Sequence, residues 1–305
     1  MKTDTKIRLG RNYRQKERAC YVMLAPQIIG FLVFSIVPML WAISLSCYNY
    51  NMIRMRFTGL ENFKILLTDK AYWTALGNTF LYAIMKIPVE LPLALILAVV
   101  LSKIKKGAGI YRAVYYLPHV VSIALVALVF SNLFGVFGVI NSAFVKAGFN
   151  MLGYNWFKTK LSSMSVVVIA DIWMSFGVNV LYFIAALANI PEEVYESAEL
   201  DGATAFQTFF RITIPMIAPT LQIILMLSII GTLGINEIII VMTNGAPGGS
   251  TYSVQSYIFQ NYAPGIANGD INVGYGCAMS LVTGLILASV TGVYMKLSSK
   301  ISGNM

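Results

Sequence analysis

The acidic residues of this chain are concentrated in one short stretch. Five of the 13 acidic residues in 305 fall within ten positions. They are Glu192, Glu193, Glu196, Glu199 and Asp201. No Ser-His-Asp arrangement accompanies them, and the single histidine, His119, has no ligand or catalytic partner pattern and is interpreted as a helix-end residue at the membrane interface. The chemistry that this stretch offers is therefore docking to another molecule rather than catalysis.

The first half of the stretch predicts a short helix. Pro191 suits the first turn, where its missing N–H costs nothing. Glu192 and Glu193 then lie at the positive end of the helix dipole. The pair Asp201-Gly202 should end the helix, because glycine accepts a positive φ that other residues resist.

The second half predicts another short helix, which starts at Ala203 and Thr204 and ends at Pro215. Helical spacing gives it an apolar face. Its members are Ala205, Phe206, Phe209, Phe210 and Ile212. A helix of this kind fits a groove on a partner. The alternative, a helix lying in the lipid interface, is disfavoured because interfacial helices carry Lys and Arg on their polar face, whereas this loop would be repelled by an anionic leaflet.

The rest of the chain indicates what positions this loop. The composition is 57% hydrophobic and 11% charged, against about 25% charged in soluble domains. A spanning helix needs about 20 apolar residues, and six segments qualify. They are 21–46, 72–102, 108–134, 161–190, 215–242 and 271–296. We therefore expect an all-α, multi-pass integral membrane protein with one membrane domain, 21–296, that holds the loop 191–214.

The basic residues predict the topology. One side of the membrane would hold 14 Lys and Arg, and the opposite side would hold 7. The 14 lie in the amino-terminal tail 1–20, in the 103–112 connection, at Arg211, and in the tail 297–305 with the end of the last span. Cytoplasmic connections carry this excess, so both termini and the acidic loop are expected in the cytoplasm. The first apolar run is too long for a cleaved signal peptide. The net charge of +9 forms no patch interleaved with aromatics, so nucleic-acid binding is not expected.

Polar side chains within the spans are candidates for a solute path. Lys86 and Glu90 share a helix face and are interpreted as a mutual ion pair, beside Pro88 and Pro92, which should kink the helix. The other candidates are Asp171, Trp173, Asn179, Tyr182, Asn236, Glu237, Ser280 and Thr283. Amides, carboxylates, hydroxyls and aromatic faces suit a sugar. Each of these residues could instead hold two helices together by a hydrogen bond.

Three motifs resemble those of importer permeases. ESAELDGATAFQTFFRITIP resembles the EAA motif, with Ser197 for the middle Ala and Ile214-Pro215 for Leu-Pro. FTGLENFKILLTDKAYWTALGNT (57–79) resembles the first outer loop of maltose-type ABC sugar importers. TNGAPGGSTYSVQSYIF (243–259) resembles their TGGGP segment, with Ala246 as a departure. The chain thus resembles the permease subunit of a binding-protein-dependent ABC sugar importer from about residue 20 onward.

The resemblance implies a type I ABC importer permease fold and a role for the loop. It implies that the loop docks in a cytoplasmic ATPase subunit and carries ATP-driven closure to the spans. The coupling residues would be Glu196, Ser197, Ala198, Asp201, Gly202, Ala203, Phe206, Phe209, Phe210 and Pro215. It also implies a second homologous permease, two ATPase subunits and an extracellular solute-binding protein in a cell membrane.

This chain has no G-x-x-x-x-G-K-[ST] loop, so it is expected to bind no cofactor and to be no enzyme, with ATP and Mg²⁺ held by the separate ATPase subunits. Three cysteines, Cys20, Cys47 and Cys277, are too scattered to predict a metal site or a disulfide. A secondary transporter driven by an ion gradient is the alternative, because Lys86, Glu90, Asp171 and Glu237 could couple ions. It would not need an ATPase docking loop.

Overall fold

The computed structural model describes residues 20–104, 106–267 and 271–302. All but the last residue of the predicted basic tail, and the last three residues of the chain, lie outside the described residues. The chain divides into two compact units. One comprises residues 1–67 and 269–281, and the other comprises 68–268 and 282–305.

The first unit is a membrane-length helix followed by a small hairpin. The chain is helical from Cys20 to Leu45, with a π-helical turn η1 (Leu32–Ile36) before α2 (Val37–Leu45). The strands β1 (Tyr48–Tyr50) and β2 (Met55–Phe57) pair antiparallel, with Tyr48 opposite Phe57. The helix α3 (Glu61–Thr68) follows. The expectation of an all-α chain is therefore corrected to a mostly helical one.

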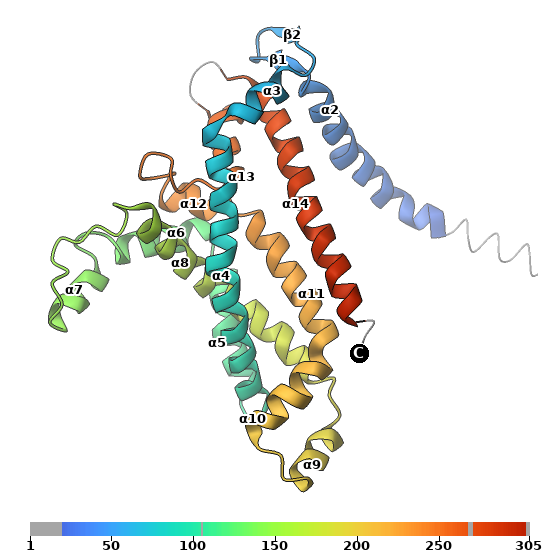
Figure 1. The fold of residues 1–305 in the computed structure, drawn as a ribbon, viewed down its shortest axis with the longest axis vertical. Helices are drawn as coiled ribbons and strands as arrows, with labels where there is room; N and C mark the ends of the chain where they lie inside the picture. Colours follow the sequence, from blue (N-terminus) through green and yellow to red (C-terminus); the bar gives the residue numbers. More distant parts are fainter. Residues whose placement is uncertain (1–19, 105, 268–270, 303–305) are drawn as a thin grey trace, which may run out of the picture. The chain divides into compact units, whose positions relative to one another are not determined.

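The second unit is built from long helices that pack side by side, with short helices at their ends (Figure 1). Its first elements are α4 (Lys70–Ser102), α5 (Ala108–Val120), α6 (Ile123–Leu133), α7 (Val139–Lys146) and α8 (Lys160–Leu187). The next are α9 (Glu192–Leu200), α10 (Ala205–Thr208), η2 (Phe209–Thr213) and α11 (Ile214–Leu233). The last are α12 (Glu237–Met242), α13 (Val254–Tyr262) and α14 (Val273–Ser302), which begins in the first unit. Within this unit α9 and α10 lie at one end, and α12 and α13 lie toward the other (Figure 1).

Five helices in the described ranges are long and apolar enough to cross a membrane. They are Cys20–Leu45, Lys70–Ser102, Lys160–Leu187, Ala205–Leu233 and Val273–Ser299. A bent pair, α5 with α6, would make a sixth. Composition and helix length thus agree on a mostly helical membrane protein with five or six candidate spans.

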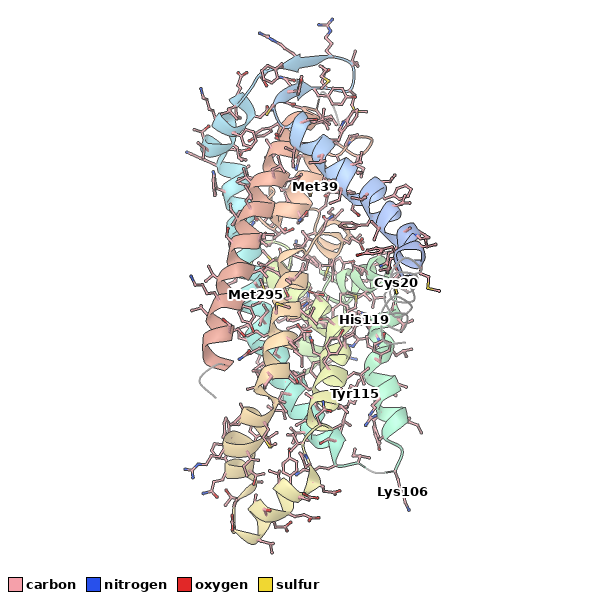
Figure 2. The ribbon with its side chains drawn as sticks, turned by 90° about the vertical axis from the view of Figure 1, so that its right-hand side faces the viewer. Cys20, Met39, Lys106, Tyr115, His119 and Met295 are labelled. Atoms are coloured by element: carbon pink, nitrogen blue, oxygen red, sulfur yellow. The ribbon has the colours of Figure 1, made fainter. Side chains whose placement is uncertain are left out.

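The predicted third span, 108–134, is not one straight helix. The chain turns by 90° between α5 and α6, where Val121 and Ser122 take extended ψ values of 141° and 134°. Figure 2 labels Tyr115 and His119 on α5, the half before this break. Both halves are apolar, so hydropathy averaged over the segment contains no sign of the bend.

The predicted fifth span, 215–242, is displaced toward the amino terminus. One helical run extends from Ala205 to Leu233, and the expectation that Pro215 ends a separate helix is wrong. The five-residue π-helical turn η2 precedes Pro215, which occupies the first turn of α11. A π turn adjusts the helix where the proline ring would otherwise meet the preceding carbonyls.

Two apolar clusters hold the second unit together. One gathers buried side chains of α6, α8 and α12, among them Val126, Val167 and Ile239. The other joins the ends of α4, α8 and α11, with Ala98 and Phe183 fully buried or nearly so. This second cluster supports α9 and η2, because Tyr195 and Phe209 pack against it.

Candidate functional site

The loop between α8 and α11 turns sharply at a glycine, as the sequence predicts. Helix α9 ends at Leu200 and Gly202 has a φ of +75°. The Ala203 N–H donates to the Ala198 carbonyl at 2.9 Å, and the Gly202 N–H donates to the Glu199 carbonyl at 3.0 Å. This pair of bonds is a Schellman motif, which satisfies the last carbonyls of the helix and needs a left-handed residue at the glycine position.

The second helix of the loop starts with a capping box. Thr204 Oγ1 accepts from the Gln207 N–H at 3.3 Å, and Gln207 Oε1 accepts from the Thr204 N–H at 2.8 Å. The predicted start at Ala203 and Thr204 is confirmed, with Thr204 as the N-cap. Both helix ends at the turn are therefore satisfied by neighbours in the chain, which fixes the geometry of the turn between α9 and α10.

The acidic side chains of α9 are exposed. Glu196 and Ser197 are exposed, whereas Ala198 is buried. The hydroxyl oxygen of the half-buried Tyr195 lies 3.3 Å from Thr213 Oγ1, and this hydrogen bond connects α9 to η2. No ion pair joins the α9 acids to a Lys or Arg whose side chain the structure describes. Their charge is available to a partner.

The three phenylalanines do not share one outward face. The Phe206 and Phe210 rings lie 4.5 Å apart, and their residues are 72% and 50% exposed. Phe209 is half-buried and packs against the second apolar cluster. The outward apolar patch is therefore the pair Phe206 and Phe210, because a π-helical start at Phe209 changes the spacing that the sequence argument assumed.

A buried charge cluster joins α4 to α8. Lys86 Nζ lies 2.6 Å from Asp171 Oδ2 and 3.6 Å from Glu90 Oε2. All three residues are buried. The closer partner of Lys86 is thus on the neighbouring helix, and the pairing with Glu90 that the sequence suggested is the longer of the two.

Hydroxyl and amide groups complete this cluster. Tyr82 donates to Asp171 at 2.5 Å, and Ser175 and Asn179 donate to Glu90 Oε1 at 2.6 Å and 2.8 Å. Asp171 and Asn179, which were candidates for the solute path, are thus engaged between helices. The signal in the sequence is a stripe at spacing four on each helix. One stripe is Tyr82, Lys86 and Glu90, and the other is Asp171, Ser175 and Asn179.

The remaining path candidates differ in their surroundings. Trp173 and Tyr182 are 47% and 43% exposed on α8. Asn236 precedes α12 with a buried Oδ1 that has no hydrogen-bond partner among the described residues, and Glu237 is exposed next to it. Thr283 is buried against the Tyr72 hydroxyl at 3.0 Å. Ser280 belongs to the first unit and bonds to the Gly276 carbonyl.

The segment after α12 is held by residues that the sequence reasoning did not single out. Asn78 Nδ2 donates to the Ser250 and Tyr252 carbonyls, both at 2.8 Å. Thr79 Oγ1 accepts from the Val254 N–H at 2.9 Å. The two α4 side chains thus pair backbone groups of a loop more than 170 positions away in sequence. Two adjacent buried polar residues in an apolar span are the only local sign of this role.

The arrangement defines a class of protein: a multi-pass helical membrane protein with a connection between two span-length helices that presents acids and aromatic rings, as in a transporter permease. The profile of the family described as "Binding-protein-dependent transport system inner membrane component" matches residues 90–303. The chain belongs to this family. It is an inner-membrane, multi-pass permease component of an ABC transporter, and the ATPase is a different component.

Similar proteins cover nearly the whole chain. A probable ABC transporter permease, YesP of Bacillus subtilis, is 34% identical over 299 residues, covering 96% of this chain and 94% of YesP. The trehalose/maltose permease MalF of Thermococcus litoralis is 32% identical, covering 90% and 92%. A solved bacterial ABC transporter involved in alginate import has a TM-score of 0.80 at 22% identity, covering 95% and 99%. The resemblance to maltose-type permeases is thereby confirmed, as is the permease fold.

Proposed function

We propose that this chain is one permease subunit of an ATP-driven importer for a sugar, an oligosaccharide or a related polyol. Family membership supports the importer class, and the likeness to a trehalose/maltose permease supports the solute class. The full assembly would contain a second homologous permease, two ATPase subunits that bind ATP and Mg²⁺, and an extracellular solute-binding protein.

The proposed topology has six spans and both termini in the cytoplasm. The helices that match the predicted spans are separated by connections whose Lys and Arg favour this orientation. The α5–α6 pair would be the third span, bent within the membrane. This topology puts the α9–α10 loop on the cytoplasmic side, where an ATPase subunit could reach it.

The observation that carries the coupling role is the shape of this loop. Two short helices meet at a left-handed glycine, and they carry five exposed acids and two exposed rings. Phe206 and Phe210 would enter an apolar groove of the ATPase, and Glu196 and Asp201 would pair with its basic rim. Phe209 would instead transmit the movement inward, because it packs against the cluster that includes α4, α8 and α11.

For the solute path, we propose three exposed side chains and one whose buried amide oxygen has no hydrogen-bond partner among the described residues. These are Asn236, Glu237, Trp173 and Tyr182. Asn236 follows a break between two helices, and such breaks near mid-membrane leave backbone groups free for a ligand. The engagement of Asp171 with Lys86 also weakens the ion-driven alternative, since a coupling acid must be able to release its cation.

The first experiment is gentle solubilisation of membranes followed by capture on a carboxyl-terminal tag. We expect an ATPase subunit and a second permease in nearly equal amounts. Capture of this chain alone, with solute movement driven by an ion gradient, would overturn the proposal in favour of a secondary transporter.

The coupling loop is tested by substitution of Gly202. At a φ of +75° a β-branched side chain costs about 1–2 kcal/mol or more in backbone strain, so Gly202→Val should abolish stimulated ATP hydrolysis without preventing membrane insertion. Gly202→Asp should have a smaller effect, because Asp tolerates left-handed backbone better than Val. Gly109 is the matched control, because a Cβ there meets nothing within 4 Å and its φ is not positive. Normal stimulated turnover in Gly202→Val would contradict the coupling role.

A further inference from the structure

A cavity of about 800 Å³ lies where the long helices of the second unit end. Ser102 and Lys103, at the end of α4, line it, as do Leu187 and Ile190, at and beyond the end of α8. The opposite side is formed by α9, α10 and η2. Lys103, which follows the long apolar run of α4, lines the cavity, and this change from apolar to charged residues is typical of the level where hydrocarbon gives way to water.

The cavity has an apolar wall and a rim of both charges. Its wall includes Ile184, Leu187 and Phe209, of which the first two are buried. Its rim holds two exposed cations, Lys103 and Arg112, and two exposed acids, Glu192 and Glu199. A purely apolar ligand would pair with none of these four charges, and a purely anionic ligand would be repelled by the two carboxylates.

We propose that this cavity binds the headgroup and upper acyl chain of a zwitterionic aminophospholipid, phosphatidylethanolamine. The lipid phosphate would pair with Lys103 and Arg112, since clustered cations at the inner ends of spans favour phosphate headgroups. Its ammonium would donate hydrogen bonds to Glu192 and Glu199. The acyl chain would cover the wall formed by Ile184 and Leu187.

The site has a consequence for α9, because the lipid would lie between this helix and the ends of α4 and α8. The helix is already tied to η2 by the Tyr195–Thr213 hydrogen bond. A bound lipid would add a second contact beside it, because Tyr195 and Thr213 also line the cavity. We therefore expect the composition of the membrane to affect how firmly α9 is held, whatever docks on its outer face.

The test uses the complete transporter in nanodiscs of phosphatidylcholine containing phosphatidylethanolamine or phosphatidylglycerol, with lipid retention after detergent extraction measured by native mass spectrometry. Lys103→Ala and Arg112→Ala should each weaken retention of phosphatidylethanolamine about fivefold, from the loss of one headgroup contact. Lys106→Ala is the matched control: Lys106 lies on the same connection, does not line the cavity and projects away from the helices (Figure 2).

Two further variants distinguish the effect of the rim charges from the effect of the cavity volume. Glu192→Gln with Glu199→Gln should remove the preference for phosphatidylethanolamine over phosphatidylglycerol, because the charged partners of the ammonium, which phosphatidylglycerol lacks, are gone. Ala188→Trp should reduce retention of both lipids, because Ala188 lines the cavity and is exposed.

Three results would overturn the site: equal retention in Lys103→Ala and Lys106→Ala, equal retention of phosphatidylcholine and phosphatidylethanolamine by the unmodified protein, or cross-linking of Ala188→Cys to an ATPase subunit in place of lipid. Retention is measured without ATP or solute. A failure of the lipid site is therefore distinguishable from a failure of the proposed transport function.

Discussion

Removal of the Lys86 ammonium should be among the most damaging single changes in this protein. Lys86→Met keeps the length and apolar volume of the side chain but leaves Asp171 and Glu90 buried without their cation, 2.6 Å and 3.6 Å from its former nitrogen. The three side chains expose at most a tenth of their area, so water cannot replace the lost partner.

The magnitude follows from what is left behind. Breaking one partner out of a buried ion pair costs about 3–5 kcal/mol, because the remaining charge has no compensation. Hydrogen bonds from Tyr82, Ser175 and Asn179 remain and should keep the cost toward the lower end of that range. Neutralising the cluster in the triple variant Lys86→Met, Glu90→Gln, Asp171→Asn should cost less than Lys86→Met alone, since no uncompensated charge remains.

The assay is chemical unfolding of the purified transporter in mixed micelles, followed by circular dichroism. Lys106→Met is the control for loss of an exposed cation and should change the free energy of unfolding by no more than about 0.5 kcal/mol. If Lys86→Met unfolds at the same denaturant concentration as Lys106→Met, the cluster does not stabilise the α4–α8 contact and the reasoning fails.

Other predictions concern close packing, a buried amide and a phenol. Gly177→Ala should separate α5 from α8, because a Cβ there would overlap the Tyr115 carbonyl, and should cost about 1–3 kcal/mol or more in the same unfolding assay, whereas Gly284→Ala, with open space around it, should not. Asn78→Ala removes two hydrogen bonds to the segment after α12, worth about 0.5–1.5 kcal/mol each, and should make that segment more sensitive to proteolysis. Burial raises the pKa of the Tyr257 phenol above its ordinary value of 10.0. The folded state therefore keeps a proton that the unfolded chain releases above about pH 10, stability falls as pH rises further, and Tyr257→Phe should reduce that fall in an unfolding midpoint measured against pH.

Local features of the α9–α10 loop were accessible to sequence reasoning because they depend on neighbours in the chain. The helix end at Asp201-Gly202 and the start at Thr204 follow from backbone preferences and caps that act over three to five residues. The structure confirms both. The inward orientation of the Phe209 side chain could not be predicted, because it depends on a π-helical turn and on the apolar cluster against which the ring packs.

Breaks within apolar segments were also missed. Hydropathy measures how well a segment partitions into hydrocarbon, and it has the same value for a straight helix and for two halves at 90°. The predicted spans 108–134 and 215–242 therefore extend across the α5–α6 bend and the break after Leu233.

The sequence by itself determined the class of the protein. A chain that is 57% hydrophobic, with several long apolar segments, has to be a membrane protein. Only the tertiary structure decided how the polar residues within the spans are used. The stripes on α4 and α8 are each visible in the sequence, but their meeting depends on which helices pack together. That choice is made by contacts between residues about 85 positions apart, and the spacing of residues along one helix contains no information about them.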